Sequence, residues 1–377
     1  MPGLYVHIPF CLKKCHYCDF VITTKNSPQT RHNFLQAIEK EAVQAAIRYG
    51  RGLFDTLYFG GGTPSLLDER EIRRLSELLR GTFDFAPGAE ITCEVNPGDA
   101  TPEKLEAYKT LGINRISLGV QSFNDRLLED MGRAHNAAAA LTTLRLLQKH
   151  GFSNISADLI LRLPNQTTED VLFSLEQLIE AGVSQAALYD LDIHEKTVYG
   201  LRRRQNRLSL PDETAHKEMF AEAERVLEKA GYLHYELMTF AKPGFESRHN
   251  LIYWTNGDYL GIGPGAFSYM NGVRYQLAAD MRRWLEKCSG DSWEPDDSEE
   301  ISEKNKQIET LLTGLRLNRG VSLSSLPSLQ PRLEKLFPDL IPQGLIELSD
   351  NRIRLTRQGR FVAESIIGQM VGACFNP

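Results

Sequence analysis

The chain has 377 residues, of which 42% are hydrophobic and 24% charged, and this composition is ordinary for a folded protein of one large or two smaller domains. Its formal net charge of −6 argues against a protein that binds nucleic acid by neutralising phosphates, so no nucleic-acid partner is expected. No segment resembles a signal peptide or reaches the roughly 18 apolar residues of a membrane-spanning helix, which predicts a cytoplasmic location.

Strand-like and helical patterns alternate over residues 1–195. The segments that indicate strands lie at 4–8, 55–62, 90–97, 115–122, 155–164 and 185–193. The helix after 90–97 has Thr101 as its N-cap and Pro102 at its first position, and a later helix opens with the capping-box pair Thr167 and Asp170. These β/α units predict an α/β fold, a partial (β/α)6 barrel with a parallel sheet. Such barrels carry their chemistry at the C-terminal ends of the strands.

Beyond residue 195 this alternation stops. Residues 196–288 contain a basic run, a long amphipathic helix and a glycine-rich stretch, and we interpret them as a lid segment. Residues 289–304 are acidic and serine-rich, which predicts a linker. Residues 305–377 are predicted to form a small winged-helix-like domain, in which two short strands turn at 350–351 ahead of a helix.

Three of the six cysteines lie together just after the first predicted strand, in a C-x-x-x-C-x-x-C spacing. They are Cys11, Cys15 and Cys18. Clustered thiols in a reducing compartment point to a metal and not to a disulfide framework. A [4Fe–4S] cluster held by three thiolates leaves one iron free for a small chelating molecule. The residues alone leave open a zinc site completed by His7, by His16 or by a distant residue.

Glycines and polar residues follow the later strands, where barrel chemistry is expected. The run Gly60–Gly62 with Thr63 ends the second strand, and its lack of side chains lets a ligand approach the backbone. Glu94 ends the third strand, where it can accept hydrogen bonds from ribose hydroxyls or an amino group; a surface ion pair is the alternative. Arg133 can clamp a carboxylate, although singly it and Gln121 resemble ordinary surface or capping residues.

The motifs HIPFC-x-x-x-C-x-YC-x-F, GGGTPS, GVQSF and HNLIYW together resemble the radical S-adenosylmethionine superfamily. Within it, they are most similar to the HemW-type haem chaperones of the oxygen-independent coproporphyrinogen III oxidase-like family. The resemblance spans nearly the whole chain and implies a radical SAM barrel whose three clustered cysteines hold a [4Fe–4S] cluster. It assigns contacts with S-adenosylmethionine to Tyr5, Gly61, Gly62, Thr63, Glu94, Gln121, Arg133 and Asp158.

The segment His249–Trp254 matches an H-N-x-x-Y-W signature of the haem-binding relatives. Imidazole is a normal axial ligand of haem iron, so the resemblance implies that His249 binds haem as cargo. A histidine hydrogen-bonded within a lid is the alternative. The resemblance also implies haem or porphyrin, haem-receiving client proteins and an electron donor as partners. It leaves open a peripheral membrane contact and a homodimer.

Three functions compete at this point. The first is a haem chaperone, favoured by the HNLIYW segment and by Phe20, which stands where the related dehydrogenase has a further cysteine. The second is an oxygen-independent coproporphyrinogen III dehydrogenase, and the third is a radical methyltransferase that opens the haem ring. Arg162, Phe267 and the segment LDIHEKTVY depart from the pattern of the relatives, which leaves the substrate less certain than the cofactors. Whether the protein is an enzyme stays open.

Overall fold

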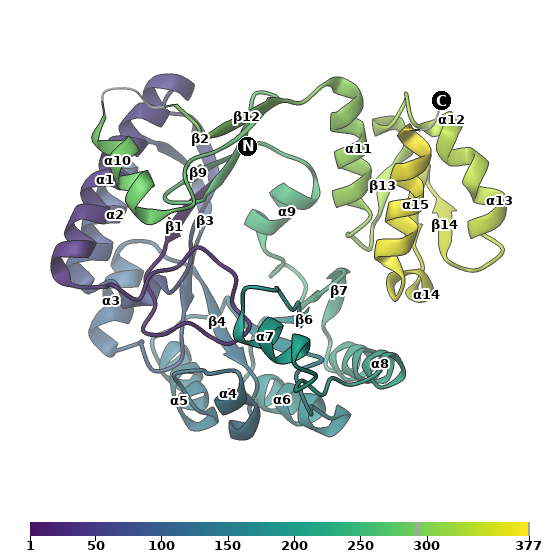
Figure 1. Ribbon diagram of the computed structural model, residues 1–377, viewed down its shortest axis with the longest axis horizontal. Helices are drawn as coiled ribbons and strands as arrows, with labels where there is room; N and C mark the ends of the chain where they lie inside the picture. Colours follow the sequence, from purple (N-terminus) through teal and green to yellow (C-terminus); the bar gives the residue numbers. More distant parts are fainter. Residues whose placement is uncertain (291–293, 376–377) are drawn as a thin grey trace.

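The structure is a computed structural model that describes residues 1–290 and 294–375. Within these residues, twelve strands form one sheet in the order β12-β11-β10-β9-β1-β2-β3-β4-β5-β6-β8-β7, and three more form a small second sheet. Helices surround the outer face of the large sheet, as Figure 1 shows. No helix in the described part of the chain combines the length and the apolar character needed to cross a membrane.

Six parallel strands form the centre of the large sheet, and neighbours along the chain are neighbours in space. They are β1 (Gly3–Ile8), β2 (Leu53–Gly61), β3 (Asp84–Val95), β4 (Arg115–Gln121), β5 (Ile155–Leu161) and β6 (Gln185–Asp190). The connecting helices are α1 (Pro28–Tyr49), α2 (Glu69–Thr82), α3 (Pro102–Thr110), α4 (Asp125–Asp130), α5 (Ala137–Lys149) and α6 (Thr168–Glu180). The predicted partial (β/α)6 barrel is confirmed.

Local sequence explains where these helices begin. Thr101 caps α3 by accepting a hydrogen bond from a backbone N–H, and Thr167 with Asp170 forms the predicted capping box of α6. Helix α1 begins at Pro28, ahead of its apolar pattern, because Ser27 caps it and proline suits the first turn. The alternating residues of each strand then separate two faces, one packed against helices and one lining the barrel interior.

Short strands extend both edges of the parallel sheet. On one edge β9 (Tyr259–Ile262) pairs with β1, and β10 (Phe267–Met270), β11 (Val273–Gln276) and β12 (Asp297–Glu300) follow in antiparallel order. On the other edge, β8 (Thr239–Ala241) pairs with β6, and β7 (Leu233–Glu236) pairs with β8. The lid interpretation of residues 196–288 therefore needs extending, because this segment supplies strands to both edges. The acidic stretch 289–304 supplies β12, and its residues 291–293 lie outside the described residues.

The same segment also contains helices, which pack around the sheet. They are α7 (Val198–Arg204), α8 (Glu213–Lys229), α9 (Arg248–Trp254) and α10 (Met281–Ser289). Helix α8 packs against α6, and α10 packs against α1. Both thus continue the outer helical layer. Helix α9 instead contacts β2 and, as shown below, closes one end of the barrel.

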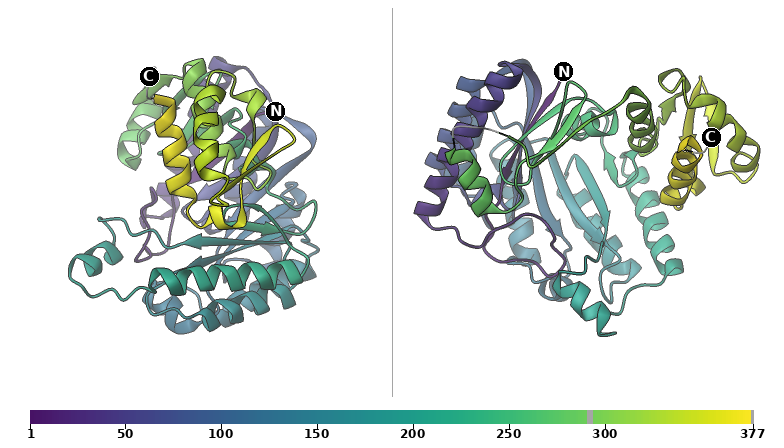
Figure 2. Two further views of the ribbon diagram at one scale, coloured as in Figure 1. Left: turned by 90° about the vertical axis from the view of Figure 1, so that its right-hand side faces the viewer. Right: turned by 45° about the horizontal axis from the view of Figure 1, so that its top comes forward.

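The last part of the chain folds around a core of its own. Its helices are α11 (Glu303–Gly314), α12 (Gln330–Leu333), α13 (Phe337–Leu340), α14 (Arg357–Arg360) and α15 (Ala363–Phe375), and its strands are β13 (Val321–Ser322), β14 (Ile346–Ser349) and β15 (Arg352–Leu355). Strands β14 and β15 turn at Asp350 and Asn351, both with positive φ, as a two-residue hairpin requires. Figure 2 shows this C-terminal domain to one side of the large sheet.

A buried carboxylate joins the C-terminal domain to the barrel. Glu224 of α8, whose side chain is 1% exposed, accepts hydrogen bonds from Arg357 at 2.6 Å and from Arg360 at 2.7 Å, both in α14. His234 of β7 lies 3.2 Å from the same carboxylate. Burial alone would raise the pKa of Glu224, but the hydrogen bond with His234 and the arginine charges lower this pKa to about 2. The carboxylate is therefore charged across the ordinary pH range.

Candidate metal and cofactor site

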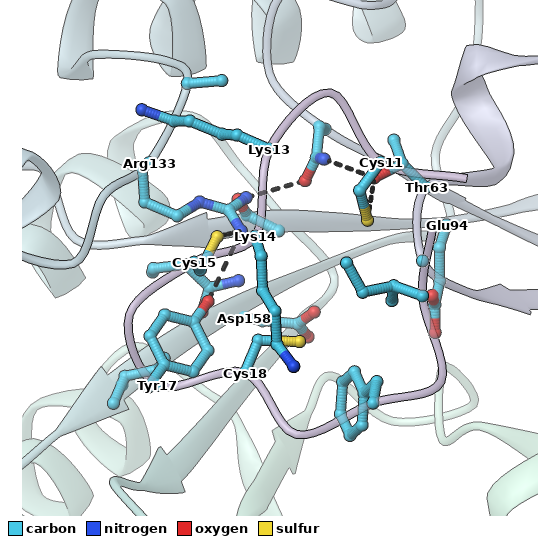
Figure 3. Close-up of a pocket in the computed structure, with 18 of the residues that line it drawn as sticks. Cys11, Lys13, Lys14, Cys15, Tyr17, Cys18, Thr63, Glu94, Arg133 and Asp158 are labelled. Carbon is cyan, nitrogen blue, oxygen red and sulfur yellow. Dashed lines mark hydrogen bonds between the residues drawn. The ribbon is translucent and has the colours of Figure 1, made fainter. Parts of the chain in front are cut away.

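The loop between β1 and α1 carries the three clustered cysteines across the C-terminal ends of the parallel strands. Cys11, Cys15 and Cys18 are partly buried free thiols. Figure 3 shows their sulfur atoms around one open space that the loop encircles. This space belongs to a cavity of about 540 Å³, which residues from β2 to β6 also line. The volume is typical of a site for a small molecule.

Two side chains from outside the loop contact cysteine sulfurs. Arg133 Nη1 lies 3.6 Å from Cys15 Sγ, and Thr63 Oγ1 lies 3.5 Å from Cys11 Sγ. Asn96 connects the two, because its amide donates to Thr63 Oγ1 at 3.0 Å and accepts from Arg133 Nη2 at 2.7 Å. The strand ends thereby fix the position of the cysteine loop.

The thiols of Cys11 and Cys18 are harder to ionise than an ordinary cysteine, because burial raises the pKa of both. Burial, together with the neighbouring Cys18 and Cys15, raises the pKa of Cys11 to about 11, although the Thr63 hydroxyl lowers it. Metals bind the thiolate form, so metal binding would have to displace these protons. Three thiolates at separate positions of one loop suit three irons of a [4Fe–4S] cluster. The Nε of Arg133 is also buried without a partner in the described residues, which fits a site that a bound group completes.

The surroundings of His7 and His16 bear on the zinc alternative. In the part of the chain that the structure describes, no three His, Cys, Asp or Glu side chains come together closely enough to hold one ion. His7 accepts the Tyr5 hydroxyl at Nδ1 and donates from Nε2 to the carbonyl of Val21 at 2.7 Å. His16 donates from Nδ1 to the carbonyl of Asp130 at 2.6 Å, an arrangement that leaves Nε2 as its possible ligand atom. In a cluster each thiolate binds a different iron, so the three sulfurs need not converge.

Two carboxylates lie under the cavity. Glu94 accepts the Tyr58 hydroxyl at 2.9 Å on Oε1 and the backbone N–H of Gly61 at 3.1 Å on Oε2. Burial, followed by the charge of Asp158, raises the pKa of Glu94 to about 7. Burial also raises the pKa of Asp158 to about 6, despite nearby arginines. Carboxylates withdrawn from water favour a cationic ligand, such as a sulfonium or an ammonium group.

Most residues assigned from the sequence lie together at this cavity. Those that line it are Cys11, Cys15, Cys18, Gly61, Gly62, Thr63, Glu94, Gln121, Arg133 and Asp158. Gln121 adopts a left-handed backbone with φ 68° at the end of β4. Tyr5 does not line the cavity; its ring lies in the barrel interior, beside Tyr58 and below Gly60. A direct contact between Tyr5 and the cofactor is therefore not supported by this geometry.

His249 lies nearer the opposite end of the barrel, in α9. Glu90 of β3 accepts hydrogen bonds from the backbone N–H groups of Arg248 at 3.1 Å and His249 at 3.0 Å, so the start of α9 is anchored inside the barrel. The His249 side chain is 2% exposed. Its Nδ1 lies 2.6 Å from Thr56 Oγ1, and its Nε2 lies 2.9 Å from the Tyr253 hydroxyl. Both ring nitrogens are engaged, so the expected role as a haem ligand does not fit this arrangement.

Sequence reasoning missed three residues that complete the site. Tyr17, whose hydroxyl lies 3.4 Å from Arg133, sits between the second and third cysteines of the loop. Asn96 follows two residues after Glu94, and Tyr58 precedes the glycine run by two residues. All three residues lie inside or beside motifs that the sequence analysis had recognised. Since alternate residues of a strand share one face, the residues two positions from Glu94 and from the glycine run could have been considered as site residues.

The open parallel barrel and the three-cysteine loop define a radical SAM protein, and residues 5–178 match the profile of the Radical SAM superfamily. Residues 301–362 match the HemN C-terminal domain. The heme chaperone HemW of Bacillus subtilis is 34% identical over 99% of this chain and 100% of its own length, and the heme chaperone HemW of Lactococcus lactis is 37% identical over 94% and 93%. This chain belongs to the HemW family. The structure of coproporphyrinogen III oxidase (HemN) from Escherichia coli shares the fold, with a TM-score of 0.85 at 24% identity over 99% of this chain and 90% of that one.

Proposed function

We propose that this protein binds haem and delivers it to haem proteins, and that its cysteine loop holds a [4Fe–4S] cluster with S-adenosylmethionine at the open iron. The observation that carries the proposal is the similarity, over nearly the whole chain, to proteins named heme chaperone HemW. When bound, such a cluster supplies an electron to S-adenosylmethionine. The partners are haem, the client proteins that receive it, and an electron donor.

In this proposal each part of the cavity has a distinct task. The three thiolates bind iron, and Arg133 and Thr63 hold two of the sulfurs in place. The glycine run lets the methionine end approach the backbone. The carboxylates of Glu94 and Asp158 line the cavity and stabilise the positive charge of the ligand.

The mouth of the cavity has the chemistry that haem requires. Leu12 and Phe20 of the cysteine loop are 61% and 68% exposed, so two large apolar side chains lie open beside the cavity. Such an exposed apolar surface is typical of a binding site and suits a porphyrin face. Lys13 and Lys14 line the same cavity, as Figure 3 shows, and neither forms an ion pair within residues 1–290 and 294–375. Their ammonium groups suit the two propionates of haem, so we place haem at this mouth.

Reversing both charges, with Lys13→Glu and Lys14→Glu, is expected to weaken haem binding about tenfold, because attraction to the propionates becomes repulsion. Haem titration followed by absorbance measures the affinity. The matched control is Lys40→Glu with Lys149→Glu, two exposed lysines on α1 and α5 that give the same change of charge. Equal haem affinities of the two double variants would show that haem does not bind at the cavity mouth.

Delivery is tested separately, with haem-loaded protein and a haem-free b-type cytochrome as acceptor. Direct transfer predicts a rate that rises with acceptor concentration, whereas simple dissociation gives a rate independent of it. A concentration-independent rate would count against a chaperone. Anaerobic incubation with coproporphyrinogen III and S-adenosylmethionine completes the test, since stoichiometric decarboxylated product would favour the dehydrogenase instead.

A further inference from the structure

Aromatic side chains lie in the barrel interior between α9 and the cavity. The His249 and Tyr58 rings stack with centroids 5.0 Å apart and planes at 30°. The Tyr5 ring lies 6.0 Å from that of Tyr58 and 6.4 Å from that of His249. We call Tyr5, Tyr58 and His249 the interior stack. Hydrogen bonds with Thr56 and Tyr253 hold the His249 ring in place.

The glycine run rests directly on the interior stack. A Cβ atom at Gly60 would lie 2.8 Å from the Tyr58 ring and 2.9 Å from the Tyr5 ring. A Cβ atom at Gly61 would lie 2.6 Å from the His7 ring. Contacts this close leave no room for any side chain. The Tyr5, Tyr58 and His7 rings therefore limit how far the glycine backbone can move into the barrel.

Tyr58 also connects the stack to the carboxylate at the site. Its hydroxyl donates to one oxygen of Glu94, and the other oxygen accepts the N–H of Gly61. One carboxylate therefore joins a ring of the stack to the glycine run. Any tilt of the Tyr58 ring changes both the position of Glu94 and its hydrogen bonding.

We infer that Tyr58 and His249 are positioning residues for S-adenosylmethionine, acting through Glu94 and the glycine run without touching the ligand. Helix α9 supports His249, His249 supports the Tyr58 ring, and Tyr58 orients the Glu94 carboxylate. The inference rests on the proposed binding of S-adenosylmethionine and extends it. It gives the HNLIYW segment a role at the cofactor site in place of contact with haem iron.

The charge state of Glu94 offers a readout of this arrangement. The ionisable groups that act on Glu94 or on its neighbours include Tyr5 of β1, Tyr58 of β2, Cys93 of β3, Arg115 of β4, Asp158 of β5, Tyr189 of β6, Arg133 and, farther out, Lys104, Tyr108, Tyr235, Glu236 and Tyr253. Burial raises the pKa of each of these tyrosines, so they stay neutral near pH 7. Loss of the Tyr58 hydroxyl removes a hydrogen bond to the charged form of Glu94 and raises its pKa further. Binding that needs the carboxylate then moves to higher pH.

The test measures S-adenosylmethionine affinity by calorimetry, on cluster-loaded protein, over a series of pH values. Tyr58→Phe is expected to weaken binding about tenfold at neutral pH and to move the midpoint of the pH profile upward. Tyr232→Phe is the control, because it removes a tyrosine hydroxyl that donates to the carbonyl of Val183 at 2.5 Å, outside the cavity. Tyr232→Phe should change thermal stability, whereas its affinity for S-adenosylmethionine and the midpoint of its pH profile should equal those of the parent protein.

Variants at His249 separate ring support from iron binding. His249→Ala is expected to weaken S-adenosylmethionine binding in the same direction, and His249→Phe, which restores a ring, to recover much of it. Both variants should bind haem with the affinity of the parent protein. Parent-like affinity and midpoint in Tyr58→Phe would overturn the inference, as would a His249→Ala protein that loses haem alone. A parent that binds no S-adenosylmethionine would instead refute the proposed function.

Discussion

Replacing Cys11, Cys15 or Cys18 with serine is expected to remove most of the iron and sulfide that the parent protein takes up in anaerobic reconstitution. A serine hydroxyl is a poor ligand for iron–sulfur clusters, which thiolates hold. With one iron already left free of protein ligands, the loss of a further thiolate leaves only two sites of attachment. Chemical assay of iron and sulfide, with the absorbance of the reconstituted protein, measures the effect.

Two of the three remaining cysteines provide the control. Cys288 of α10 and Cys374 of α15 are buried, at 5% and 0% exposure, in the cores of the two domains. Cys288→Ala and Cys374→Ala should therefore bind as much iron as the parent. A loop variant that keeps its iron would contradict the assignment of the three ligands.

Glu224→Gln is expected to lower the free energy of unfolding by about 3 kcal/mol, because it leaves the Arg360 guanidinium without its counter-charge and disturbs the hydrogen bond with buried His234. Arg360 is 15% exposed and His234 is 3% exposed, so water does not replace the lost carboxylate charge there. Arg357 is 57% exposed and contributes less. Urea denaturation measures the loss, and limited proteolysis reports whether the C-terminal domain separates from the barrel.

The same carboxylate predicts a pH dependence. The pKa of Glu224 is lowered in the folded protein from 4.5 to about 2, so its contribution is complete above pH 4.5 and is lost as the pH falls through about 2. The difference between the parent and Glu224→Gln should shrink over that range. Glu222→Gln on the same helix is the control, because its pair with the exposed Arg225 should contribute almost nothing. Equal effects of the two variants would contradict the buried network.

Features set by neighbouring residues could be predicted from the sequence. The caps at Thr101 and Thr167 and the turn at Asp350 and Asn351 act within four or five residues, and the structure contains each of them. The cysteine loop is also a local motif, and the order of the parallel strands follows from the alternation of strand and helix. The cavity then forms because parallel strands bring their C-terminal ends to one edge.

Pairings between distant segments could not be predicted. Strand β12 consists of four exposed polar or acidic residues, so no apolar alternation marks it as a strand. His249 meets Thr56 across 193 residues, and nothing in the HNLIYW segment shows that its histidine is buried. Arg162 has φ 63°, a region that favours glycine, and nothing in the structure explains the arginine at this position.

The central claim is that three thiolates hold a cluster whose remaining iron binds S-adenosylmethionine, and paramagnetic resonance tests it most directly. Protein reconstituted without oxygen and reduced with dithionite should give the signal of a reduced [4Fe–4S] cluster, and added S-adenosylmethionine should change that signal. The absence of a signal, or a signal that S-adenosylmethionine leaves unchanged, would contradict the account.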